Sequence, residues 1–177
     1  MNSEHSPLEI FRHCPKCGSQ SFKPDTEKSL KCGSCGFRYF INMAAAVAAI
    51  IRNEKNEVLF TIRKHDPAIG MLDLPGGFVD LGETAEKALF REIHEELNLT
   101  INKMEFVGTF TNKYIYGDIE YLTLDLVFNC TVESFHNLQV ADDVSGYIFR
   151  DTKIVQPENI GLESIRKIVR FLTSQKL

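Results

Sequence analysis

The chain has 177 residues, of which 44% are hydrophobic, and it carries a formal net charge of -4 at pH 7. This composition is typical of a globular protein with one main domain and one small appendage, and it excludes a low-complexity chain. The longest apolar stretch, Met43 to Ile51, is too short to span a bilayer and lacks the preceding basic region of a signal peptide. We therefore expect a cytoplasmic protein without a membrane span.

Four cysteines near the N-terminus form two Cys-x-x-Cys-Gly knuckles, with fourteen residues between Cys17 and Cys32. Each tight turn aims two thiolates at one point, so that two turns complete a tetrahedral shell for Zn²⁺. No secretory signal opens the chain, and the thiols are expected to stay reduced rather than to form disulfides. A shell of four protein ligands has no vacant position, which is typical of a structural zinc site. The ligands are Cys14, Cys17, Cys32 and Cys35.

This zinc ribbon is expected to span residues 1–40, a segment too short for an adequate core, to which zinc binding supplies the missing folding energy. Its basic residues outnumber its acidic ones, which favours nucleic-acid binding only weakly because the protein as a whole is acidic. A structural role, for example in homodimer formation, is the simpler interpretation. A fifth cysteine, Cys130, lies in an apolar strand-like run and is interpreted as a small core residue.

The second domain is expected to span residues 41–177 and to begin with two strands. Residues 44–51 are rich in alanine and could be helical, yet a turn cluster at 52–57 and an apolar run at 58–62 favour a β-hairpin. Small residues in the first strand would let a buried central strand pack closely.

A glycine-containing loop and a helix follow. The adjacent glycines of Leu74-Pro75-Gly76-Gly77 allow a close backbone approach that side chains would forbid. The helix is expected to begin with Thr84 or Glu83 near its cap and with acidic charge at the positive end of its dipole. It is expected to end near Leu97, where Asn98 can adopt the left-handed conformation usually given to glycine.

Three acidic side chains share one face of this helix, within a stripe of roughly 100°. They are Glu92, Glu95 and Glu96. Acids at this spacing repel one another unless cations lie between them, and hard cations such as Mg²⁺ or Mn²⁺ prefer carboxylate oxygens. A Glu-rich face can also be merely solvated. The glycine loop just upstream, whose carbonyl can face the carboxylates, favours the metal site.

The remaining elements alternate between strands and helices. Residues 104–110 and 121–132 are rich in β-forming residues, and a short strand at 146–149 follows an acidic turn at 141–143. A final amphipathic helix is predicted at 162–172. This order of strands and helices fits an α/β/α sandwich with a mixed sheet.

The acidic segment has a defined spacing of residue types. It consists of Gly77, Glu83, Arg91-Glu92, Glu95-Glu96 and the closing aliphatic Leu99. The segment resembles the signature box of the Nudix hydrolases over twenty-three residues. One position departs, because Asn98 stands where the family usually has glycine. Asn is the next most tolerant residue for that backbone conformation, so we expect the helix to end there normally.

The resemblance implies an α/β/α Nudix fold and metal-dependent hydrolysis of a diphosphate bond. It also implies metal ligation by the Gly76 carbonyl together with Glu92, Glu95 and Glu96, with support from Glu83 and orientation of the cluster by Arg91. Glu92 is the leading candidate for the general base. A loop acid beyond the box takes that role in several Nudix enzymes, which makes Asp142 and Asp143 the alternative.

Substrate contacts outside the box are harder to predict. Arg63 ends the second strand close to the glycine loop and can pair with a phosphate, although an exposed strand-end Arg is an equal alternative. Phe110, Tyr114 and Tyr116 can stack on a base, although aromatic residues in strands more often belong to the core.

A zinc ribbon before a Nudix domain resembles the NADH pyrophosphatase group, yet this chain lacks that group's Ser-Gln-Pro-Trp-Pro-Phe-Pro-like segment after the box. It has Thr109-Phe110-Thr111-Asn112-Lys113-Tyr114 instead, and it contains no Trp. We therefore expect a nucleoside diphosphate linked to another moiety as substrate, with ADP-ribose or a nucleotide sugar ahead of NADH.

Two other functions are open at this stage. One is a non-catalytic regulator that senses a nucleotide, although every acid of the box is present and no helix-turn-helix segment follows. The other is removal of a nucleotide cap from RNA, with the basic residues of the ribbon holding the strand.

Overall fold

The computed structural model describes residues 5–174. The chain divides into two compact units, Met1–Met43 with Tyr114–Leu122, and Ala44–Lys113 with Thr123–Leu177. The division at residue 40 predicted from the sequence stays a proposal, to which the structure adds the hairpin tip at 114–122. Within the described part of the chain, no helix is long and apolar enough to cross a membrane.

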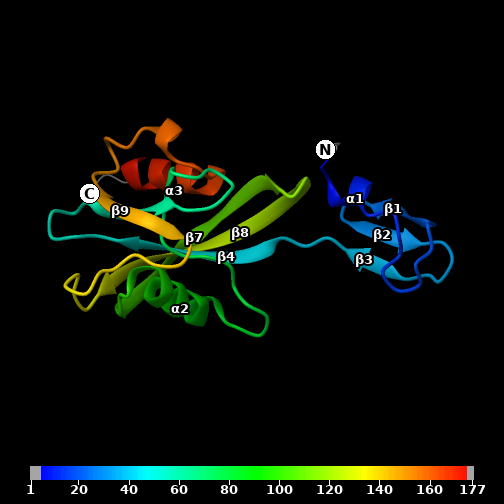
Figure 1. Cartoon of the computed structure of the whole chain (residues 1–177), viewed down its shortest axis with the longest axis horizontal. Coiled ribbons are helices and arrows are strands. Elements are labelled where there is room, and N and C mark those ends of the chain that lie inside the picture. Colours follow the sequence, from blue (N-terminus) through cyan, green and yellow to red (C-terminus); the bar gives the residue numbers. More distant parts are fainter. Residues whose placement is uncertain (1–4, 175–177) are drawn as a thin grey trace. The chain divides into compact units, whose positions relative to one another are not determined.

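The first unit is built on a small antiparallel sheet (Figure 1). Its strands are β1 (Phe22–Thr26), β2 (Ser29–Cys32) and β3 (Arg38–Phe40), in that order, and a short helix α1 (Pro7–Ile10) precedes them. The buried core consists of only Cys14, Phe22, Leu30 and Cys32. Two of these four residues are cysteines of the knuckles, so the core and the predicted zinc site are inseparable.

The second unit contains two three-stranded sheets. The first has the order β4 (Ala44–Ile51), β8 (Ile119–Val132) and β7 (Ile101–Tyr116), and β4 runs parallel to β8. The second has the order β6 (Leu72–Asp73), β5 (Val58–Arg63) and β9 (Val144–Arg150), with antiparallel pairs. The predicted hairpin of the first two strands is therefore wrong. The two strands exist, but they lie in different sheets. In the described part of the chain their antiparallel contact is confined to the turn, at the bridge between Arg52 and Val58 and the hydrogen bond from Asn53 N–H to the Glu57 carbonyl.

Helices cover both sides of these sheets, as Figure 1 shows for α2 (Ala85–Leu97) and α3 (Glu163–Ser174). A 3₁₀ turn, η1 (Pro157–Asn159), precedes α3. Strand β4 is buried on both faces. Val47, Ala49 and Ile51 pack in the core with α2, whereas Ala48 and Ile50 pack in the core with α3. The predicted α/β/α sandwich with a mixed sheet is thereby confirmed, and small residues in its central strand allow both layers to approach.

Candidate active site

The loop after β6 lies along β4. Backbone N–H groups of β4 donate to the carbonyls of Pro75 and Gly77 at 2.8 Å each, and Val79 N–H donates to Ala45 at 3.0 Å. Gly76 has φ +142°, and a Cβ there would overlap the Val47 carbonyl oxygen. Only glycine suits this position. Among the described residues, none donates a hydrogen bond to the Gly76 carbonyl oxygen, so this oxygen can accept a further ligand.

Helix α2 has the ends predicted for it. The Thr84 hydroxyl caps the N-terminus by accepting from Lys87 N–H, and Asn98 ends the helix in the left-handed conformation at φ 52°. Leu89, Ile93 and Leu97 are fully buried in the core. Glu92 lies on another side of the helix, against Gly77 of the glycine loop, and Glu95 is exposed. Glu96 lies at the boundary, only 7% exposed, and accepts a hydrogen bond from Gly76 N–H at 3.0 Å.

Arg91 connects the acids of the box. Its Nε and Nη2 donate to the two carboxylate oxygens of Glu83 at 3.1 and 2.9 Å. Its Nη1 donates to Glu92 at 2.8 Å and to Glu95 at 3.1 Å. Nη2 also donates to the Phe78 carbonyl at 3.0 Å, which ties the helix to the loop. Only a planar guanidinium can make this set of contacts, because lysine has a single nitrogen.

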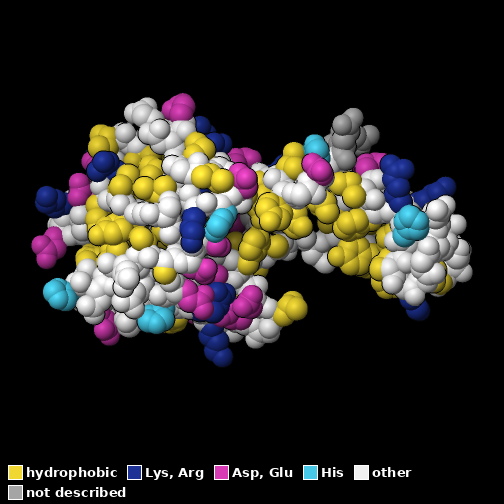
Figure 2. All heavy atoms as spheres, in the orientation of Figure 1, with side chains coloured by type: hydrophobic (Ala, Val, Ile, Leu, Met, Phe, Trp, Pro, Cys, Tyr) yellow, Lys and Arg dark blue, Asp and Glu magenta, His cyan; other side chains and the backbone are white. Residues whose placement is uncertain are grey.

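Negative charge is concentrated beside α2, and Figure 2 shows acidic side chains gathered there with basic ones among them. Burial, together with the charges of Glu92, Asp73 and Asp143, raises the pKa of Glu96 to about 8, against the Gly76 hydrogen bond. Burial also raises the Glu92 pKa, which Arg91 opposes and Glu95 and Asp142 reinforce. The local charge is more than one guanidinium can balance.

A second loop brings Asp142 and Asp143 to this cluster. Ala141 N–H donates to the Glu96 carbonyl at 2.9 Å, which fixes the loop at the C-terminal part of α2. The segment after β5 holds the loop from its other side. Lys64 donates to the Asp142 carbonyl at 2.7 Å, and His65 Nε2 lies 3.6 Å from Asp143 Oδ1. Sequence reasoning did not identify Lys64 or His65, since no motif marks them.

The chemistry of these residues suits a divalent-metal site, although among the described His, Cys, Asp and Glu residues only the four knuckle cysteines bring their ligand atoms within 4.8 Å of one another. Three carboxylates and an available carbonyl supply the oxygen ligands that Mg²⁺ and Mn²⁺ prefer. Gly77 contributes by lacking a side chain, since a Cβ there would lie 2.5 Å from Glu92 Oε1. Burial raises the pKa of Glu96 and the neighbouring carboxylates raise it further, so a bound cation would favour its ionised form. Residues that would hold the ions are Gly76, Glu92, Glu95 and Glu96.

The four candidate substrate contacts do not form one group. Arg63 is an internal ion-pair partner, donating to Asp73 Oδ2 and to the Pro67 carbonyl at 2.6 Å each. Phe110 packs edge-on against Phe171 of α3, with ring centroids 5.8 Å apart. In the other unit, Tyr114 and Tyr116 each contact Tyr121, at centroid distances of 5.8 and 6.4 Å.

Two buried acids near the box were also missed. Asp73 is 8% exposed and Asp125 is 6% exposed. Burial raises the pKa of Asp73, Arg63 opposes the increase, and Asp125 adds to it. Asp125 accepts a hydrogen bond from the Thr123 hydroxyl at 2.6 Å. Single acids in strands carry no sequence signal of this kind.

The four knuckle cysteines gather in one cluster, as predicted. All four sulfurs lie within 4.8 Å of one another, and the Sγ distances Cys14–Cys35 and Cys17–Cys32 are 3.7 Å. A regular tetrahedron with Zn–S bonds of about 2.3 Å has edges of about 3.8 Å, so the cluster has the size that Zn²⁺ requires. Gly18 and Gly36 close the knuckles by donating to the Cys14 and Cys32 carbonyls at 2.8 and 3.0 Å.

Comparisons with known proteins agree with this geometry. The NAD-capped RNA hydrolase NudC of Vibrio parahaemolyticus is 28% identical over 101 residues, which cover 57% of this chain and 38% of that protein. The NudC of Actinobacillus succinogenes is 29% identical over 119 residues, which cover 62% and 45%. The chain thus spans less than half the length of these curated relatives.

Solved structures show the same fold. A NUDIX hydrolase from Nitrosomonas europaea matches with a TM-score of 0.67 at 21% identity, over 93% of this chain and 92% of that one. The NUDIX domain of Shewanella oneidensis NrtR, complexed with ADP ribose, matches with a TM-score of 0.62 at 19% identity, over 77% and 91%. The model of the NUDIX domain matches residues 42–170. This match covers most of the chain, which therefore belongs to the NUDIX domain family.

Proposed function

We propose that the chain is a metal-dependent pyrophosphohydrolase that cleaves the diphosphate bond of a nucleoside diphosphate linked to another moiety. One observation carries the proposal: the Gly76–Gly77 loop meets Glu92 and Glu96, and Arg91 contacts Glu83, Glu92 and Glu95. A non-catalytic sensor would not need to retain this costly concentration of charge.

Gly76, Glu92, Glu95 and Glu96 would hold Mg²⁺ or Mn²⁺. Bound ions would neutralise phosphate oxygens and lower the pKa of an attacking water. Glu92, itself one of these ligands, would accept the proton from that water, because Arg91 orients its carboxylate through a hydrogen bond of 2.8 Å. Asp142 and Asp143 remain the alternative base, and their contribution to the pKa values of Glu92 and Glu96 supports their proximity.

The substrate class has two candidates. The chain has residues 109–114 in place of the Ser-Gln-Pro-Trp-Pro-Phe-Pro-like segment. This difference favours ADP-ribose or a nucleotide sugar over NADH as the substrate. The relatives named as NAD-capped RNA hydrolases favour the nucleotide-capped end of an RNA as the substrate. Both candidates contain the same nucleoside diphosphate, so the proposed chemistry is shared.

A substrate panel tests the proposal. ADP-ribose, a nucleotide sugar, NADH and an NAD-capped oligoribonucleotide are incubated separately with the zinc-loaded chain and Mg²⁺, and products are separated by chromatography. We expect a nucleoside monophosphate, or a 5′-monophosphorylated RNA, from at least one compound. Glu92→Gln is the matched control, because it preserves size while removing the charge. Failure of all four compounds in the presence of either Mg²⁺ or Mn²⁺ would overturn the assignment.

A further inference from the structure

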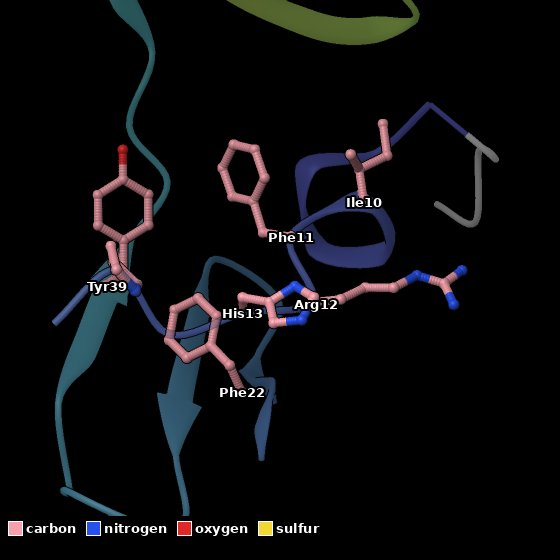
Figure 3. Close-up of a pocket in the computed structure, with 7 residues that line it drawn as sticks. Ile10, Phe11, Arg12, His13, Phe22 and Tyr39 are labelled. Carbon is pink, nitrogen blue, oxygen red and sulfur yellow. The ribbon is translucent and has the colours of Figure 1, made fainter. Parts of the chain in front are cut away.

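The ribbon contains a pocket that folding alone does not explain. It has a volume of about 450 Å³ and lies between the segment before the first knuckle and the sheet. Figure 3 shows the rings of Phe11, His13, Phe22 and Tyr39 turned toward one another, with Arg12 extending outward from them. A small zinc-dependent unit gains stability by burying aromatic surface, yet here Tyr39 stays 43% exposed.

The geometry of the rings suits a flat aromatic ligand. Phe11 and Tyr39 meet edge to face, with centroids 6.3 Å apart and an interplanar angle of 66°. Phe22, which is 4% exposed, forms the fixed floor because it belongs to the ribbon core. Zinc would hold Cys14, the neighbour of His13, in place. A pocket of this kind can accept a base by stacking, whatever the base's hydrogen-bonding pattern.

Charge distinguishes a nucleic acid from an apolar protein side chain as the occupant. Within the described residues, Arg12, Lys16, Lys23 and Lys31 have no acidic partner. Lys23 lies directly opposite Lys31 across β1 and β2, and Lys31 lies opposite Arg38, whose partner is Asp25 at 2.8 Å. Like charges opposed in this way destabilise a sheet. A polyanion relieves that repulsion, whereas an apolar protein surface does not.

These cations lie on two sides of the same small sheet. Arg12 lines the pocket, while the row of Lys23, Lys31 and Arg38 alternates with Phe22 and therefore faces the other way. The Debye length in physiological salt is about 8 Å. The row therefore adds to the positive potential of the small ribbon as a whole, while Arg12 supplies positive charge at the pocket itself.

We propose that this pocket binds a base of single-stranded RNA and that Arg12 contacts an adjacent phosphate. The inference deepens the proposed function, because it gives the RNA substrate class a separate place to bind on the ribbon. The probe is a fluorescently labelled ten-nucleotide oligoriboadenylate with a 5′-monophosphate. It has no diphosphate bond, so a failure to bind and a failure to hydrolyse are separate results.

Fluorescence anisotropy with the full zinc-loaded chain measures the affinity. Tyr39→Ala is expected to weaken binding by at least about fivefold, the lower bound for loss of one stacked base. The control Tyr147→Ala removes an equally exposed tyrosine (41%) from the other unit and should have no effect. Zinc content must stay at one ion per chain in both variants, which separates loss of the pocket from unfolding of the ribbon.

Salt dependence tests the phosphate contact. Arg12→Gln should reduce the slope of log affinity against log salt by about 0.7, the value for one phosphate of a single strand, whereas the exposed Arg170→Gln should not change it. If AMP displaced the oligonucleotide when both were present at the same molar concentration, the pocket would be reassigned to a free nucleotide. Absence of binding, or equal losses in the two tyrosine variants, would overturn the proposal. So would a dimer that Tyr39→Ala dissociates without any binding of RNA.

Discussion

Adding one methyl group at Gly77 should inactivate the protein without unfolding it. The new Cβ would lie 2.5 Å from Glu92 Oε1 and 2.6 Å from its Cδ, and ordinary contact begins at 3.4 Å. The loop cannot retreat easily, because the Gly77 carbonyl accepts from Val47 N–H at 2.8 Å. The Glu92 carboxylate must therefore move by about 0.9 Å from its observed position. A displacement of about 1 Å at a reacting group costs roughly 100-fold in rate.

Gly76→Ala is the matched control, because the same methyl group would meet the backbone instead. It would overlap the Val47 carbonyl, at a residue with φ +142°. Strain and overpacking together should cost about 2–4 kcal/mol, which lowers Tm by roughly 5–15 °C for a unit of this size. Gly77→Ala should change Tm by only a few degrees.

Differential scanning calorimetry and turnover of the best compound in the substrate panel, measured on both variants, separate these effects. If Gly77→Ala kept more than a third of the turnover, the Glu92 carboxylate would not be working from its observed position. If its Tm fell as far as that of Gly76→Ala, the backbone and not the carboxylate would have yielded, and the reasoning would be wrong.

Glu92→Gln should lower kcat by about 100- to 10,000-fold, whereas Asp142→Asn and Asp143→Asn should each lower kcat by less than about tenfold. Steady-state kinetics that gave the reverse order would assign the general base to the loop. Arg91 lowers the Glu83 pKa below its ordinary 4.5, so this ion pair stabilises the fold above pH 4.5 and the effect is lost as pH falls through the lowered pKa. Glu83→Gln should therefore be less stable than the unchanged chain by a constant amount from pH 7 to pH 5, with a gap that shrinks below pH 4.5 in urea titrations; a gap that widens would contradict this sign. Chelation should release one zinc ion per chain and raise hydrogen exchange across residues 14–40 only, whereas equal exchange in the second unit would mean that the units do not fold independently.

The parts of the structure that the sequence predicted well are those with local signals. The ends of α2 were predicted because the cap at Thr84 and the left-handed residue Asn98 lie within the helix sequence itself. The cysteine cluster was predicted because the spacing within each knuckle fixes its turn. Burial of Cys130, at 4% exposed, followed from its apolar neighbours.

Strand pairing had no such signal. The turn cluster at 52–57 favoured a hairpin, yet β4 pairs with β8, more than seventy residues further along the chain. Parallel pairing between distant segments leaves no mark on either one, because the pairing depends on the packing of α2 and α3 on opposite faces. The contacts of Lys64 with the Asp142 loop and the burial of Asp73 depend on that same arrangement.

Strand β4 has a consequence for how such a protein can diverge. Successive residues of this strand pack alternately into two different cores. Its backbone also forms hydrogen bonds with the Pro75–Val79 loop at every second residue. Insertion of one residue would exchange the two cores and shift the loop together, so selection should keep the length of this strand fixed. Exposed segments such as the hairpin turn at 115–118 belong to neither core and are free of that constraint. New substrates can therefore be acquired by changing these segments while the hydrolytic chemistry is inherited intact.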